Sequence, residues 1–112
     1  LTTEELINST NEAESSAEIR KRVIRARKLQ AKRYEKENIL TNSELTANLI
    51  KKYCKLDEAS TQIMKSASEK YQLSGRRYNR VLKIARTIAD LAEKENIEIT
   101  HLTQALQYRN EI

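Results

Sequence analysis

The segment SGRRYNRVLKIARTIADLA, residues 74–92, carries the clearest helical pattern in the sequence. At about 100° per residue, its apolar side chains cover about a third of a helix, and Ile84 and Leu91 widen this to nearly half. Ser74 can cap the first turn. A helix that is apolar over half its circumference lies inside a bundle, so we expect this one to be the central element. The remaining face is predicted to be polar and consists of Arg76, Arg80, Lys83, Arg86, Thr87 and Asp90.

Similar start signals divide the rest of the chain into helices. Ser15 with Glu18 forms a capping box, which predicts a helix that runs to about residue 37. A second capping box, Thr41 with Glu44, predicts a shorter helix that ends near Tyr53. Single residues that can cap two further helices are Asp57 and Thr100. The helix that begins after Ser15 presents one narrow inward stripe, formed by Ile19, Val23, Ala26, Gln30 and Tyr34.

The composition agrees with a helical chain. Sandwiches, barrels and doubly wound folds need tight turns rich in Gly and Pro, and this sequence has one Gly and no Pro. We therefore predict an all-α fold, a bundle of four or five helices. Residues 15–112 are expected to form the one domain, and residues 1–14 are interpreted as a connector, ordered or disordered in isolation. Since Leu1 is not an initiator Met, we expect a fragment or a processed chain.

Several kinds of chemistry find no support in the sequence. A single Gly excludes a phosphate-binding loop of the GxxxxGK[ST] type, so we expect no enzymatic activity from this chain by itself. Cys54 and His101 are the only Cys and His, and two distant ligands do not make a zinc site. We interpret His101 as a solvated residue of a first helical turn and Cys54 as a small core residue in a reducing cytoplasm. No apolar run predicts a membrane span or a secretory signal.

Positive charge gathers in residues 20–36, where nine basic side chains stand against one acid, Glu35. Because acids are so scarce there, intrahelical Glu–Lys pairs cannot neutralise the helix. We predict that its face meets the phosphates of DNA or neighbouring subunits, without sequence readout, since nothing marks recognition of bases. The predicted contacts are Arg20, Arg22, Arg25, Lys28, Lys32 and Arg33, and the same face carries Lys21, Arg27 and Lys36.

A second basic group opens the helix over residues 74–92. A helix N-terminus offers free amides and positive potential, and Gly75 lets another backbone or a ligand approach closely. Arg76 adds a planar fork suited to phosphate oxygens, and Arg80 lies one turn further on the same side. We predict that Gly75, Arg76 and Arg80 sense a nucleotide phosphate held by a different domain. The alternative is a capped helix with surface arginines.

Two blocks of the sequence resemble a known family. LSGRRYNRVLKIARTIADLAEKENIEITHLTQALQYR, residues 73–109, resembles the C-terminal end of magnesium-chelatase-like AAA+ ATPases of the ComM (YifB) type. SSAEIRKRVIRARKLQAKR, residues 15–33, resembles the first helix of their lid, and residues 34–72 match only loosely. The resemblance implies an AAA+ lid that supplies a sensor-2 arginine at Arg76, with Arg77 and Arg80 as weaker candidates.

The resemblance also implies what surrounds the lid. ATP and Mg²⁺ are the implied cofactors of the parent protein, and none is implied for this chain in isolation. The implied partners are an upstream ATPase core, neighbouring subunits of a hexameric ring, and DNA handled in natural transformation and branch migration.

Three functions from different classes remain open. The first is the lid of a motor ATPase, the second a stand-alone helical nucleic-acid-binding domain that uses residues 20–36, and the third a structural oligomerisation module. A phosphate-binding loop encoded upstream of Leu1 would favour the lid, and an intact short reading frame would favour the second function.

Overall fold

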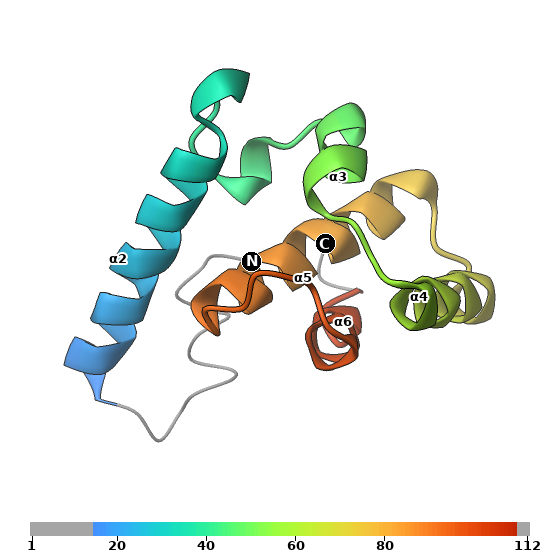
Figure 1. Cartoon of the computed structure of the whole chain (residues 1–112). Helices are drawn as coiled ribbons and strands as arrows, with labels where there is room; N and C mark the ends of the chain where they lie inside the picture. The colour runs from blue at the N-terminus through green and yellow to red at the C-terminus, as the bar shows by residue number, and fades with distance from the viewer. Residues whose placement is uncertain (1–14, 110–112) are drawn as a thin grey trace.

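The computed structural model describes residues 15–109, and within that range it contains helices and no strand. The predicted all-α bundle is confirmed, because five α-helices lie in this range. The predicted connector, residues 1–14, lies outside the described residues, as do residues 110–112. In chain order, the elements are α2 (Ser16–Arg33), the 3-10 turns η1 (Glu35–Glu37) and η2 (Asn42–Glu44), α3 (Ala47–Tyr53), α4 (Glu58–Tyr71), α5 (Gly75–Leu91) and α6 (Ile99–Leu106) (Figure 1).

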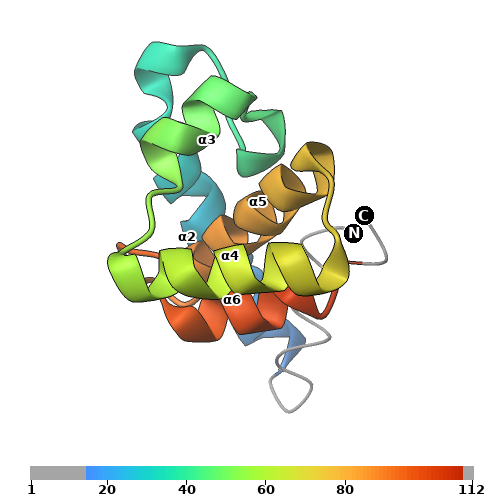
Figure 2. The same cartoon turned by 90° about the vertical axis from the view of Figure 1, so that its right-hand side faces the viewer.

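Helix α5 is the central element, as its sequence predicts. It contacts α2, α3, η2 and α6, and α4 packs on α6. Figure 1 shows α2 to one side of α5, and Figure 2 shows α4 and α6 alongside each other. Burying a large apolar side chain stabilises a fold by about 1.5–3 kcal/mol, so this core is the main source of stability. Its members without exposed surface include Tyr34, Met64, Val81, Ala85, Ala89, Leu102 and Ala105.

Local hydrogen bonds start three helices where the sequence predicts. The predicted cap accepts a hydrogen bond from the backbone amide three residues further on, at 3.3 Å for Ser15, 2.7 Å for Asp57 and 3.2 Å for Ser74. Each bond satisfies one of the amides that a first helical turn leaves without a partner. The predicted inward stripe of α2 is also confirmed, with Ile19 half-buried and Val23, Ala26, Gln30 and Tyr34 buried.

The predicted single helix over residues 41–53 is wrong. The Glu44 carboxylate accepts from the Thr41 amide at 3.2 Å, but this capping box closes only the short turn η2. Leu45 is extended, and Thr46 then caps α3. In one continuous helix, Leu45 and Ile50 would stand about 140° apart, and the break allows both side chains to be buried.

Helix α2 ends at Arg33 and not near residue 37. The backbone of Tyr34 leaves the helical region (φ −103°, ψ 16°). Its ring is fully buried, and its hydroxyl donates a hydrogen bond to Oδ1 of Asn42. The tertiary position of this tyrosine therefore ends the helix.

The predicted cap of α6 at Thr100 is also wrong. The helix begins at Ile99, and Glu98 is its N-cap. The Glu98 amide donates to Nδ1 of His101 at 2.9 Å, so an imidazole takes the place that a glutamate holds in most capping boxes.

A buried polar network joins α2, η2 and α5 at Asp90, whose side chain has no exposed surface. Arg33 donates two hydrogen bonds to this carboxylate, from Nη2 to Oδ1 at 2.6 Å and from Nη1 to Oδ2 at 3.0 Å. Arg86 Nε donates to Oδ1 at 3.2 Å, and Asn42 Nδ2 donates to Oδ2 at 3.0 Å. Although burial lowers the pKa of Arg33, its hydrogen bond to Asp90 raises that pKa overall.

The prediction that Arg86 and Asp90 lie on a polar outer face is wrong. Arg86 is 4% exposed, and its two terminal nitrogens donate to the carbonyls of Lys94 at 2.9 Å and Glu95 at 3.0 Å. A buried charge is tolerated when it is paired and hydrogen-bonded, and this one meets both conditions. Arg86 therefore holds the loop between α5 and α6 against the core.

Candidate functional site

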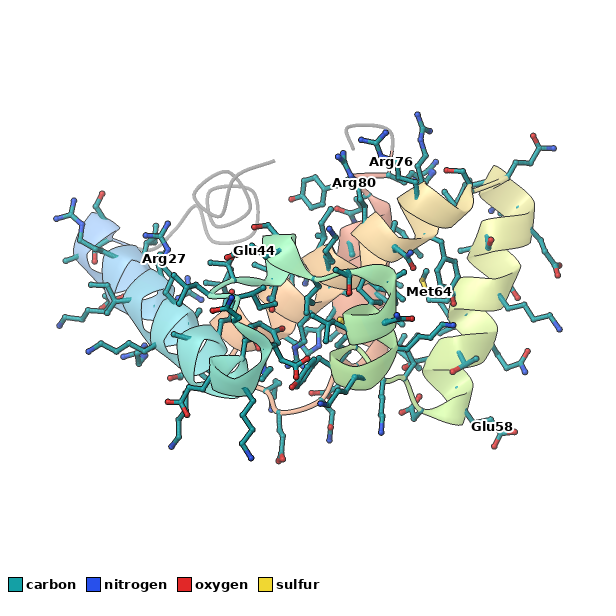
Figure 3. The ribbon with its side chains drawn as sticks, turned by 90° about the horizontal axis from the view of Figure 1, so that it is seen from above. Arg27, Glu44, Glu58, Met64, Arg76 and Arg80 are labelled. Carbon is teal, nitrogen blue, oxygen red and sulfur yellow. The ribbon has the colours of Figure 1, made fainter. Side chains whose placement is uncertain are left out.

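The first turns of α5 present three cations along one groove. Arg76, Arg80 and Lys83 lie four and three residues apart, which keeps them on one side of the helix. Figure 3 shows Arg76 and Arg80 projecting from the same side of α5. The groove is open, with a volume of about 230 Å³, below the roughly 300–1,000 Å³ of pockets that enclose a small molecule. The other lining residues are Leu45, Ala47, Ile50 and Asn79.

Among residues 15–109, no carboxylate lines this groove, so its charge is not neutralised by that part of the chain. Lys83 Nζ donates to the Ser43 carbonyl oxygen, at 3.3 Å. Burial and the nearby charge of Arg80 lower the pKa of Lys83. An anion in the groove would offset both effects, so the arrangement favours negatively charged ligands. Lys83 is predicted on the polar face of this helix but not in the nucleotide-sensing group, although its spacing of seven residues from Arg76 places it on the same side.

The two residues next to Arg76, Arg77 and Gly75, differ in their surroundings. Arg77 is exposed and does not line the groove. At Gly75, no atom of residues 15–109 outside its own turn lies within 4 Å of the place a Cβ would take, and its φ is not positive. Neither the backbone nor the packing within the described chain therefore requires a glycine there. As far as the described residues go, the space beside the first turn is open to another group.

The basic residues of α2 fall into different environments. Arg33 belongs to the buried Asp90 network, so it is not part of the exposed face. Arg25 pairs with Glu93 at 2.9 Å, in a contact where both side chains are more than half exposed. Arg22 is half-buried. The other exposed basic residues of the helix are Arg20, Lys21, Arg27, Lys28 and Lys32, together with Lys36 beyond its end.

His101 and Cys54 are both core residues. The interpretation of His101 as solvated is wrong, because it is 4% exposed and its Nδ1 caps α6. The interpretation of Cys54 as a core residue is confirmed, and burial raises the pKa of its thiol to about 11. Over residues 15–109, no cluster of three or more metal-binding side chains is present. No helix in that range is long and apolar enough to cross a membrane.

These features define a class of protein: a small helical domain whose central helix opens on a cationic groove. The sequence matches the family model described as magnesium chelatase, subunit ChlI C-terminal, over residues 13–109. The chain therefore belongs to the family of C-terminal domains of magnesium-chelatase-like proteins, as the resemblance of residues 15–33 and 73–109 predicts.

Individual relatives agree with this family. The chain is 38% identical over 104 residues to the competence protein ComM of Haemophilus influenzae, an alignment that covers 93% of this chain and 20% of the relative. It is 38% identical over 96 residues to the uncharacterized protein YifB of Escherichia coli, covering 86% of this chain and 18% of the relative. The chain thus spans about a fifth of the length of the curated relatives it matches.

Proposed function

We propose that this chain is the helical lid of a magnesium-chelatase-like AAA+ ATPase, and that Arg76 is its sensor-2 arginine. In this proposal the lid has no enzymatic activity of its own and acts on ATP that is held by an upstream core. The observation that carries it is the groove on α5, where Arg76, Arg80 and Lys83 meet with no carboxylate from residues 15–109.

The residues of the groove fit the phosphates of ATP. Guanidinium groups bind phosphate oxygens through two parallel hydrogen bonds, and an ammonium group adds a point charge. Since the described part of the chain places no carboxylate in the groove, the Mg²⁺ that accompanies ATP is assigned to the core. The small volume of the groove agrees with a partial site, completed when the lid meets the core. The open space at Gly75 leaves room for that approach.

The chemistry of the proposed lid is electrostatic. During phosphoryl transfer, negative charge spreads over the γ-phosphate oxygens, and a guanidinium positioned there stabilises the transition state. The same ion pair closes the lid on the core while ATP is bound and is lost after hydrolysis, which couples chemistry to motion. Arg76 suits this role because its helix is fixed in the core by Val81 and Leu82, while its own side chain is exposed.

Replacing Arg76 by Ala in the full-length protein tests the proposal. We expect ATP turnover to fall by about tenfold or more, because one lost charged contact is worth about 1.5–3 kcal/mol. The free energy of unfolding of the 112-residue chain should change by less than about 0.5 kcal/mol, since the side chain is exposed. Turnover is measured by phosphate release, and stability by urea unfolding.

Arg77→Ala is the matched control, because it removes the same group from the next position, outside the groove. It should lower turnover much less than Arg76→Ala. If the Arg76 variant folds, assembles and hydrolyses ATP at the parental rate, the sensor assignment is wrong and Arg80 is the next candidate. The 112-residue chain alone should show no ATPase activity, and sub-micromolar ATP binding by calorimetry would contradict the need for a core.

The wider setting belongs to the same proposal. A relative that matches over most of this chain is named for competence. We therefore place the parent protein among DNA-processing motors of the competence and branch-migration type, as a hexameric ring in the cytoplasm. Neighbouring subunits and DNA are its proposed partners. Electron microscopy of the full-length protein with ATP tests the ring.

A further inference from the structure

The outward side of α2 is a second positively charged surface, separate from the groove on α5. Helix α2 packs against α5 along one narrow stripe, which leaves most of its circumference exposed. In Figure 3, Arg27 on α2 lies well apart from Arg76 on α5. We call five exposed cations of α2 the outer ridge: Arg20, Lys21, Arg27, Lys28 and Lys32.

The outer ridge keeps its full charge. Within residues 15–109, none of its five side chains pairs with a carboxylate, in contrast to Arg25 and Arg33 of the same helix. The ridge is also regular, because Arg20 and Arg27, like Lys21 and Lys28, are seven residues apart, or about 10.5 Å along the axis. A helix that is held in the core thus carries a fixed row of cations over about 18 Å.

The composition of the ridge favours phosphates over a protein partner. Lysine is depleted in the centres of protein–protein interfaces, and three of the five cations of this ridge are lysines. The exposed apolar side chains of α2 are Ile24 (45% exposed) and Leu29 (40%), which stand about 140° apart around the helix and so form no common patch. Isolated exposed apolar residues are common and do not mark an interface.

Apart from its arginines and lysines, the ridge also lacks groups that bind bases. Sequence-tolerant binding of single strands relies on aromatic side chains, and the nearest aromatic residue, Tyr34, is fully buried. Recognition of base edges relies on groups such as Gln and Asn, and Gln30 is buried, where it accepts from the Asn42 amide. What remains is a row of charges that matches a regular line of phosphates.

We propose that the outer ridge of α2 binds the sugar–phosphate backbone of a nucleic-acid duplex without sequence preference. Five phosphate contacts predict that the logarithm of the binding constant falls with the logarithm of the salt concentration with a slope of about −4.5. The inference does not depend on Arg76. Arg76→Ala should therefore leave duplex binding unchanged, and a failure of the sensor assignment leaves this proposal standing.

Fluorescence anisotropy of the 112-residue chain tests the ridge. The probes are a labelled mixed-sequence DNA duplex, the matching single strand and an RNA duplex, each titrated between about 50 and 200 mM salt. The variant replaces Lys21, Lys28 and Lys32 by Ala. It should make the salt slope shallower by about 3 and lower the affinity by about tenfold or more. Circular dichroism checks that this variant, like the control variant described next, remains helical.

The control replaces three exposed lysines elsewhere, Lys51, Lys55 and Lys65, by Ala, and so removes the same charge from other faces. Its salt slope should stay at the parental value. Equal losses in both triple variants would overturn the proposal, because binding would then follow net charge alone. Tighter binding of the single strand than of either duplex would overturn the duplex assignment. Absence of duplex binding at low salt would reassign the ridge to an acidic protein surface.

Discussion

The two longest helices, α2 and α5, carry similar numbers of arginines, but only α5 places one of them, Arg86, among its buried residues. Helix α5 is surrounded by α2, α3, η2 and α6, and it buries Arg86 and Asp90 among its apolar residues. Helix α2 has one buried stripe and places most of its arginines and lysines outside. The two meet where Arg33, at the end of α2, reaches Asp90 of α5.

This comparison shows that the position of an arginine in the fold decides its role. Arg86 and Arg33 share one carboxylate and hold elements together, so they are unavailable to a ligand. Arg76 faces an open groove, and Arg20 faces solvent. One residue type therefore serves structure, proposed nucleotide sensing and proposed backbone binding in the same small domain.

The largest effect is expected where the two helices share Asp90. Asp90→Asn leaves the buried guanidinium of Arg86 without a countercharge and weakens the bond from Arg33. Breaking a buried ion pair from one side costs about 3–5 kcal/mol, and we expect a loss in the free energy of unfolding near 3 kcal/mol. Urea unfolding measures this loss.

Glu93→Gln, which removes the exposed partner of Arg25, is the control and should cost less than about 0.5 kcal/mol. A loss below about 1 kcal/mol for Asp90→Asn would show that the network contributes little.

Two buried valines compare the packing of the helices directly. Val81 of α5 has no exposed surface and lies in the main core, whereas Val23 of α2 is 8% exposed and packs with Ala26 and Leu91. Val81→Ala should cost about 2 kcal/mol and Val23→Ala about 1 kcal/mol, because two methyl groups are lost and the cavity at Val23 is closer to solvent. Thermal and urea unfolding measure both. An equal or larger cost at Val23 would mean that α2 packs as firmly as α5.

The serine caps test the first turns of the same helices. Ser74→Ala should cost about 1 kcal/mol, since α5 is held in the core soon after its cap. Ser15→Ala should cost about 0.5 kcal/mol, because α2 is held by the small cluster of Val23, Ala26 and Leu91, so its first turn can fray more easily. Amide hydrogen exchange in the two first turns distinguishes them. Equal protection of both turns would contradict the view that α2 is the looser helix.

The smallest effect is expected from His101, which caps the helix packed on α5. Burial lowers its pKa, as do Arg86 and Lys94, while Glu98 opposes them. The unfolded chain therefore binds a proton more readily than the folded one. The free energy of unfolding should have its full value above pH about 6.5 and should fall as the pH drops through the folded-state pKa of His101. His101→Asn keeps an acceptor for the Glu98 amide and should remove this part of the pH dependence. An unchanged pH profile in that variant would assign the effect to other groups.

Much of the fold could be predicted from the sequence because its signals are local. The caps at Ser15, Asp57 and Ser74 act within one turn, and the apolar stripe of α5 follows from its own spacing. The candidate site was predicted only in part. Arg76 and Arg80 lie together on α5 as expected, but the apolar wall that completes the groove comes from α3 and from Leu45, two residues before it, more than 25 positions earlier in the sequence.

The sequence by itself determined the helical class, the central position of α5 and the concentration of charge on α2, because these depend on residues a few positions apart. Tertiary structure alone decided which charges remain available. Arg33 and Asp90 are 57 positions apart, and only their meeting in the core takes Arg33 out of the basic face. The break at Leu45 and the burial of His101 were decided in the same way, since core packing outweighed the local preference for a continuous helix and a solvated imidazole.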